Sequence, residues 1–397
     1  MKTKLLGIAL FAITLGAVAW YPTLDAKTNL AQTHVTRHVD HNQAPVVDVV
    51  FVLDTTGSMG GLIQTAKEKI WSIASTMASA QPTPEIRIGL VGYRDRGDEY
   101  VTRIVDLSGD LDSVYAALMD FDANGGGDGP ESVNQALNDA VNRMSWSQKD
   151  QAYQVIFLVG DAPPHMDYQD ELQYPAIIAS AAEKGIVVNT IQCGNMPVTV
   201  EPWTQIARLG NGDFFQVEQA GGAVAYTTPY DAEIADLAAK IDATRLYYGS
   251  DEDKARMEEK VAATEKLASA ASDEALARRG IFNASAAGRT NSFGENELIV
   301  AVSSGKVDLD ELPKEALPAA IAPMAPEEQR AYIAGVAEER VRLQKRIQEL
   351  ADERDAFIEK KVEAEGGRKD SLDQKLYDTV ARQAEKAGLE YSDGPAY

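Results

Sequence analysis

The feature that most constrains this chain is a near-unbroken run of apolar, mostly β-branched residues at positions 46–53, interrupted by Asp48, which ends abruptly at Asp54. An apolar run of this kind is typical of a strand buried on both faces, as in parallel sheets. Asp54, Thr56 and Ser58 stand at alternate positions, ahead of two glycines and a helical pattern. A carboxylate and two hydroxyls in one short loop are the hard oxygen ligands that Mg²⁺, Mn²⁺ or Ca²⁺ prefers. The same residue types also suit a capped turn between a strand and a helix.

Strand-like and helix-like patterns alternate through the following part of the chain. Strands are expected at residues 86–93, 100–105, 153–159, 186–191 and 214–217. Amphipathic helical spacing separates most of them, and the segment 100–105 is expected to fold back as an edge hairpin. This alternation predicts an α/β fold with a doubly wound, mostly parallel sheet that is covered by helices on both faces.

Two further segments place acidic residues where such a sheet binds ligands. A glycine-rich loop at residues 125–131 carries Asp128 and Glu131 and opens a helix, and the apolar run at 153–159 leads into Gly160 and Asp161. Ligands of open α/β sheets bind beyond the carboxyl ends of the strands. We therefore expect both segments to meet the first loop at one edge of the sheet. A phosphate-binding loop is excluded, because no Gly-Lys-Ser/Thr follows and the acidic residues would repel phosphate.

The order and spacing of these three segments resemble a von Willebrand factor A (VWA) domain over residues 46–220. The resemblance implies a Rossmann-like fold with a metal-ion-dependent adhesion site. Asp54, Thr56 and Ser58 match the first motif of that site position by position, and Asp161 matches the aspartate of its third motif. A divalent cation, Mg²⁺ or else Mn²⁺ or Ca²⁺, is then the expected cofactor.

The second motif departs from the family pattern. The threonine that usually binds the metal is absent, and Glu131 or Asp128 takes its place. If Asp54, Asp161 and Glu131 all touched the ion, three negative charges would face two positive ones, and an incoming carboxylate would be repelled. We therefore expect at least one of these acids to act through water, or the metal to be mainly structural.

The beginning of the chain is typical of an exported protein. Residues 1–19 have a basic start, an apolar core and an Ala-x-Ala end, which predicts a secretory signal peptide. Residues 20–45 form a polar linker. The protein is expected outside the cytoplasm, as a periplasmic, secreted or cell-surface protein. A membrane attachment is expected only if the apolar segment stays uncleaved, and it falls short of the roughly 20 residues of a membrane span.

The second half of the chain has a mainly helical sequence pattern. Residues 231–312 are expected to form a helical region with a short strand at 298–302, and prolines from 313 to 326 indicate a semi-rigid linker. Residues 326–397 are expected to form a helical hairpin or coiled-coil-like tail, because apolar residues recur every seven positions. Such a tail is either an arm for self-association or a hairpin packed on its own domain.

These observations favour an exported, metal-dependent protein-binding or adhesion module whose metal supports contact with a protein partner at the rim of the sheet. The formal net charge of −23 argues against nucleic acid as a partner. An enzyme is not expected, since no nucleophile is placed beside a base. The alternatives are a hydrolase that activates water on the metal, with His165 as a base, and a subunit that docks to an ATPase complex.

Overall fold

The computed structural model describes residues 44–127, 129–149, 151–218, 226–364, 372–391 and 394. The predicted signal peptide at 1–19, nearly all of the linker at 20–45, and Asp128 lie outside these residues. Within the described part of the chain, every helix is too short or too polar to cross a membrane.

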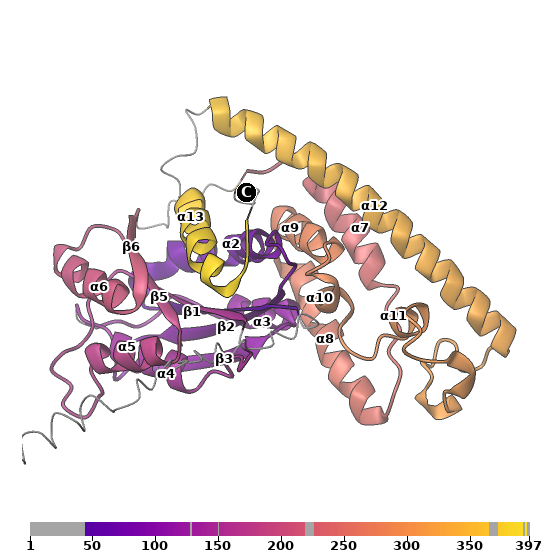
Figure 1. Ribbon diagram of the computed structural model, residues 1–397, viewed down its shortest axis with the longest axis horizontal. Helices are drawn as coiled ribbons and strands as arrows, with labels where there is room; N and C mark the ends of the chain where they lie inside the picture. Colours follow the sequence, from indigo (N-terminus) through magenta and orange to yellow (C-terminus); the bar gives the residue numbers. More distant parts are fainter. Residues whose placement is uncertain are drawn as a thin grey trace, which may run out of the picture. The chain divides into compact units, whose positions relative to one another are not determined.

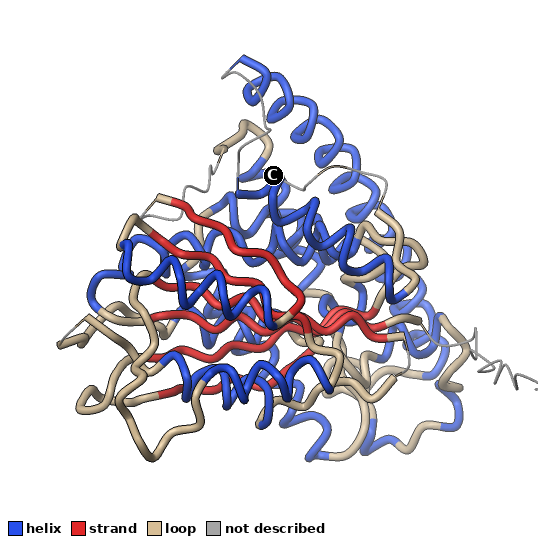
Figure 2. Tube along the Cα trace, turned by 60° about the vertical axis from the view of Figure 1, so that its left-hand side comes forward, coloured by secondary structure: helices blue, strands red, loops and turns tan. Residues whose placement is uncertain are grey.

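Six strands form one sheet in the order β3-β2-β1-β4-β5-β6, drawn in red in Figure 2. They are β1 (Val46–Asp54), β2 (Glu85–Tyr93), β3 (Thr102–Ser108), β4 (Ala152–Gly160), β5 (Val187–Cys193) and β6 (Asn211–Val217). All neighbours are parallel except β2 and β3, which form the expected antiparallel edge pair. The predicted α/β class is confirmed, since helices flank this mostly parallel sheet.

Helices cover both faces of the sheet. On one face lie α4 (Val133–Asn142), α5 (Tyr174–Glu183) and α6 (Pro197–Leu209), and on the other lie α2 (Gly60–Ala78) and α3 (Leu111–Met119). Successive side chains of a strand point to opposite faces. Val49 of β1 accordingly packs in one core and Val50 in the other, which is why β1 is apolar apart from Asp48 and its last residue, Asp54.

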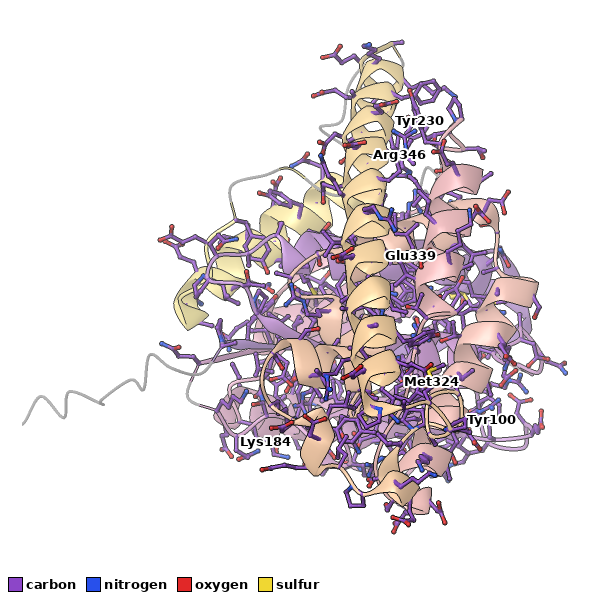
Figure 3. All side chains as sticks on the ribbon, turned by 90° about the vertical axis from the view of Figure 1, so that its right-hand side faces the viewer. Tyr100, Lys184, Tyr230, Met324, Glu339 and Arg346 are labelled. Carbon is purple, nitrogen blue, oxygen red and sulfur yellow. The ribbon has the colours of Figure 1, made fainter. Side chains whose placement is uncertain are left out.

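The helical region builds a core of its own. It comprises α7 (Asp231–Asp242), α8 (Asp251–Ala270), α9 (Asp273–Ala284), α10 (Arg289–Phe293), α11 (Leu298–Ser303) and the long α12 (Pro326–Ala364). Ile347 and Leu350 of α12 are buried together with Ile234 of α7 and Ala277 of α9. The apolar stripe predicted for self-association is therefore covered by helices of the same chain. Arg346 of α12, labelled in Figure 3, forms an ion pair with Glu233 of α7.

Two predictions for the middle of this region are wrong. Residues 298–302, expected as a strand, lie in helix α11, whose N-terminus is capped by the Glu297 side chain accepting from the Val300 amide. The proline-rich segment is packed rather than a linker, since Leu317 and Ile321 are buried in a core that also contains Ile333 of α12.

The predicted hairpin between the last two helices is not formed by the described residues. The last helix, α13 (Leu372–Ala384), instead lies against the sheet, where Figure 1 draws it in yellow beside β5 and β6. Val380 and Ala384 are buried in the core shared with β1 and β4. The heptad-like pattern predicts that a helix packs against a partner but does not identify the partner. For α13 the partner is the sheet.

A buried ionic network joins the helical region to α3. Asp112 of α3 is completely buried, and the Arg279 guanidinium of α9 donates to both of its carboxylate oxygens at 2.6 and 2.7 Å. Arg279 also donates to Asp242 of α7, and Lys260 of α8 donates to Asp110 at 2.6 Å. Three helices of the region are thus held to one helix of the sheet domain.

Candidate metal centre

The first predicted motif folds into one hydrogen-bonded turn at the carboxyl end of β1. Asp54 is the last residue of the strand, and its Oδ1 accepts from the Thr56 amide at 2.8 Å and from Thr56 Oγ1 at 2.6 Å. The hydroxyl oxygens of Thr56 and Ser58 are 3.4 Å apart. Asp54, Thr56 and Ser58 stand at alternate positions, and their carboxylate and hydroxyl oxygens gather in the same turn.

The glycine-rich loop lies directly against this turn. The Gly57 amide donates to the Gly125 carbonyl, and the Asn124 amide donates to the Thr55 carbonyl. Gly126 has a φ of +79°, and a Cβ there would lie 3.1 Å from Thr56 Cβ and 3.4 Å from Glu131 Oε1. A glycine is therefore needed for the loop to pass beside both residues.

Glu131 also connects the second loop to the third. Its amide donates to the Pro163 carbonyl at 2.9 Å, and its carbonyl accepts from the His165 amide at 3.1 Å. These bonds hold Glu131, which is only 3% exposed, beside the segment that leaves β4. The second and third loops therefore lie side by side because backbone hydrogen bonds join them.

Asp161 follows the last residue of β4 and is fixed from the side of α6. Its carbonyl accepts from Thr199 Oγ1 at 2.8 Å, and the next carbonyl, of Ala162, accepts from Trp203 Nε1 at 3.0 Å. A Cβ at Gly160 would lie 2.5 Å from the Tyr93 hydroxyl oxygen and 3.0 Å from Asp54 Oδ2. The bare backbone of Gly160 thus leaves the space in which these two oxygens lie.

The electrostatics of the acidic groups show that they share one environment. Burial raises the pKa of Asp54 to about 7, and the negative charge of Asp161 adds to this effect. Burial likewise raises the pKa of Glu131 to about 9, with the charge of Asp54 as the next cause. The pKa of Tyr93 is raised well above its usual value by burial and then by Asp54, Glu131 and Asp161. In the absence of a cation, this environment favours the protonated acids.

Three buried oxygen atoms of the centre lack a hydrogen-bond partner among the described residues: Asp54 Oδ2, Glu131 Oε2 and the Tyr93 hydroxyl. A buried polar atom without a partner is costly, so a site that holds three of them fits a bound ion or water. The described residues contain no group of three or more His, Cys, Asp or Glu side chains that could hold a metal by itself. An ion here would therefore need the hydroxyls of Thr56 and Ser58, or water, as further ligands.

The sequence did not single out Tyr93, which closes the centre from β2. Tyr93 pairs in register with Asp54, and both are completely buried. A tyrosine at the end of an apolar strand resembles an ordinary core residue. The signal that could have found it is its place at the carboxyl end of the strand next to β1, at the edge where ligands bind.

Asp95 and Asp98, in the turn after β2, support the centre from outside. The Asp95 carboxylate accepts from Ser132 Oγ at 2.8 Å and from the Tyr168 hydroxyl at 2.9 Å. The Asp98 carboxylate accepts from the Gly126 amide at 3.1 Å. These bonds link the turn after β2 to the glycine-rich loop and to the segment that follows β4.

His165 is a support of the loop rather than an exposed rim residue. It is 4% exposed, its Nδ1 lies 2.8 Å from Asp167 Oδ1, and its ring stacks on Tyr168 with centroids 4.0 Å apart. The other ring nitrogen lies 3.4 Å from Asp95. Both nitrogens therefore face protein groups, which leaves His165 poorly placed to act as a base toward a substrate.

The sheet domain is similar in sequence to known proteins. Residues 48–228 match the sequence model of the von Willebrand factor A domain. An ariadne-like RING finger protein of Acanthamoeba polyphaga mimivirus is 30% identical over 124 residues, which cover 31% of this chain and 12% of that protein. The alpha-protein kinase vwkA of Dictyostelium discoideum is 28% identical over 121 residues, covering 30% of this chain and 19% of that protein.

The similarity to these relatives is confined to a small part of them, since the chain spans 12% and 19% of their lengths. Among solved structures, the conserved hypothetical protein BatB of Bacteroides thetaiotaomicron is similar, with 18% identity and a TM-score of 0.35. The match covers 43% of this chain and 90% of BatB.

Proposed function

We propose that this chain, whose residues 48–228 form a von Willebrand factor A domain, binds a protein partner through a divalent cation held at the carboxyl edge of its sheet. Domains of this kind commonly mediate protein–protein contacts. The observation that carries the proposal is the set of unpartnered buried oxygens of Asp54, Glu131 and Tyr93. A cation at this place would balance the acidic charge that, in addition to burial, raises the pKa values of Asp54 and Glu131.

The ligands proposed for the cation are Asp54, Thr56, Ser58 and Asp161, with Glu131 as a further acid that acts through water. All of them offer hard oxygens, which suits Mg²⁺ and also Mn²⁺ or Ca²⁺. Asp128 lies in the same loop, outside the described residues, and remains the alternative to Glu131. When bound, the ion would supply a positive centre that attracts a carboxylate of the partner.

A hydrolytic role has less support than a binding role. The base expected for that alternative, His165, is held by Asp167, Asp95 and Tyr168 rather than directed to a cleft. We therefore propose a binding module that is not an enzyme. We also propose that the protein acts outside the cytoplasm, which rests on the signal-peptide pattern of residues 1–19 and argues against docking to a cytoplasmic ATPase.

Metal binding is tested by calorimetric titration of the full chain with Mn²⁺ and Mg²⁺ after treatment with EDTA. Wild type is expected to bind one ion per chain, and Asp54→Asn is expected to lose binding at least tenfold, because a direct or water-linked carboxylate is removed. Asp236→Asn is the matched control, since Asp236 is exposed and, within the described residues, pairs only with Lys240 one turn away. Equal affinities of the two variants for the ion would overturn the proposed site.

Partner binding is tested by a pull-down from an extracytoplasmic fraction, carried out in Mg²⁺ and in EDTA. The proposal expects partners that are retained by wild type in Mg²⁺ and released by EDTA, and that Asp54→Asn does not retain. Recovery of the same partners in both buffers would contradict contact through the metal, even if the calorimetry showed that an ion binds.

A further inference from the structure

A groove of about 350 Å³ lies between α10, α11 and α12 in the helical region. These helices contribute no side chain to the candidate metal centre. The volume falls within the range of small-molecule sites in proteins, which runs from roughly 300 to 1,000 Å³. The groove therefore raises the question of which ligand chemistry its lining would select.

The base of the groove is rigid and electrically balanced. Arg340 of α12 is 5% exposed, and its guanidinium donates to both carboxylate oxygens of Glu297 at 2.8 and 3.1 Å. It also donates to the hydroxyl and the carbonyl of Thr244 at 2.7 and 2.8 Å. The same guanidinium lies 4.4 Å above the ring of Phe293. Arg340 is therefore fully engaged and offers a fixed surface rather than a free charge.

The free positive charge of the groove belongs to Arg289, the first residue of α10. Its side chain is exposed, and the described residues provide it with no hydrogen bond or ion pair. Ser303 and Gln344, which also line the groove, likewise lack a partner within the described part of the chain. One cation and two neutral polar groups are thus available to a ligand on this rim.

The remaining wall is apolar. It includes Ile299, Val300, Ala337 and Val341. Val341 is 64% exposed, a large value for an aliphatic side chain on a helix whose inner face is well packed. An apolar wall beside a few polar groups is the usual composition of a small-molecule site.

We propose that this groove binds a small organic anion with an apolar body, such as a medium-chain carboxylate. The anionic group would pair with Arg289 and hydrogen-bond to Ser303 or Gln344, and the alkyl body would cover Val341 and Ala337. The chain as a whole has a net charge of −23 and repels anions. Binding of an anion therefore requires a local cation with an apolar surface next to it, and the groove supplies both.

The test is a titration of the full chain with octanoate, followed by saturation-transfer-difference NMR. EDTA is present throughout, so that the candidate metal centre cannot bind the carboxylate. Wild type is expected to bind octanoate saturably. Arg289→Gln is expected to weaken binding about tenfold or more, because a charge-assisted hydrogen bond is lost. Ala337→Leu is expected to reduce binding by narrowing the groove.

Controls separate this site from general effects of charge and of hydrophobicity. Arg342→Gln removes the same charge from an exposed position of α12 outside the lining and is expected to leave binding unchanged. Acetate tests the anionic group without a chain, and octyltrimethylammonium tests the chain with the opposite charge; both are expected to bind much more weakly. Thermal unfolding confirms that each variant is folded.

The proposal is overturned if wild type does not bind octanoate, or if Arg289→Gln and Arg342→Gln behave alike. It is also overturned if the cationic amphiphile binds as well as octanoate does. Because Arg289 is exposed and has no partner among the described residues, its substitution is not expected to disturb the fold, and the outcome is readable even if Ala337→Leu is unstable.

Discussion

Gln383 of α13 and Asn189 of β5 exchange two hydrogen bonds, although 194 positions separate them in the sequence. Asn189 Nδ2 donates to Gln383 Oε1 at 3.1 Å, and Gln383 Nε2 donates to Asn189 Oδ1 at 2.9 Å. The Tyr153 hydroxyl of β4 donates to the same Gln383 oxygen at 2.7 Å. All three side chains are buried, so this contact fixes the last helix on the sheet.

The first prediction concerns that contact. Gln383→Leu is expected to lower the free energy of unfolding by about 3 kcal/mol, because the buried polar groups of Asn189 and Tyr153 lose their partner. Urea unfolding followed by circular dichroism measures the change. Gln374→Leu, which removes the same amide from an earlier turn of α13, is the control and is expected to cost less than about 1 kcal/mol. Equal effects would contradict the role given to Gln383.

The second prediction concerns the ionic network at Asp112. Asp112→Ala leaves Arg279 and Lys260 buried without their central carboxylate, so the free energy of unfolding is expected to fall by about 3–5 kcal/mol. Asp310→Ala breaks an exposed pair with Arg330 and is expected to cost less than about 1 kcal/mol. Denaturant unfolding of both variants compares a buried with an exposed ion pair.

The same network predicts a dependence on pH. Although burial acts in the opposite direction, the charges of Arg279 and Lys260 hold the pKa of Asp112 well below its usual range. The folded state therefore favours the ionised form, and its contribution to stability is present above the unfolded pKa of about 3.9 and is lost as the pH falls through the folded value. Wild type is expected to lose stability below about pH 4 more steeply than Asp112→Ala does. If the free energy of unfolding falls equally steeply with decreasing pH in both proteins, this prediction is wrong.

The third prediction concerns the space at Gly160. Gly160→Ala places a methyl group 2.5 Å from the Tyr93 hydroxyl oxygen and 2.9 Å from Asp54 Cβ, so it is expected to destabilise the protein by about 1–3 kcal/mol and to weaken metal binding. Gly127→Ala is the control in the same edge of the sheet, because a Cβ there meets no atom within 4 Å.

A double variant identifies the cause of that loss. Tyr93→Phe removes the closest oxygen, so adding it to Gly160→Ala is expected to restore part of the stability. If the double variant is no more stable than Gly160→Ala alone, the clash with Tyr93 is not the reason. Thermal unfolding and calorimetric titration with Mn²⁺ provide the two measurements.

The fourth prediction concerns Glu131, an acid of the second loop. Glu131→Thr removes one negative charge from the centre, so the Mn²⁺-loaded variant is expected to bind acetate about tenfold more tightly than wild type does. Displacement of metal-bound water by acetate is followed by water-proton relaxation. Glu99→Thr removes an acid that is 79% exposed and is expected to leave the affinity for acetate unchanged. If wild type and Glu131→Thr bind acetate with equal affinity, the charge of Glu131 does not weaken the binding of a carboxylate.

The site residues that could be predicted from the sequence are those at the ends of predicted strands. Asp54 and Asp161 each stand directly after a long apolar run, and parallel strands bring such positions to one edge of the sheet. Tyr93 also ends an apolar run, but a tyrosine at that position resembles an ordinary core residue, so the sequence does not mark its hydroxyl as part of the site.

The errors in the helical region have a common physical origin. Residues 298–302 form a short apolar run, and periodicity cannot distinguish a strand from a buried helix at that length. The decisive contact is local, the Glu297 cap on the Val300 amide. The position of α13 is likewise fixed by contacts that the spacing does not encode, namely the burial of Val380 and Ala384 against the sheet and the hydrogen bonds of Gln383.

The packing of α13 on the sheet determines which fragments of the protein can be expressed. The sheet domain is discontinuous in sequence, since residues 372–391 complete a surface that begins with residues 46–217. An expression fragment cut at residue 228 would uncover Tyr153 and Asn189 together with the apolar residues around them. A soluble minimal form would need to carry the terminal helix back onto the sheet, by a short engineered connection or as a separate peptide added in trans.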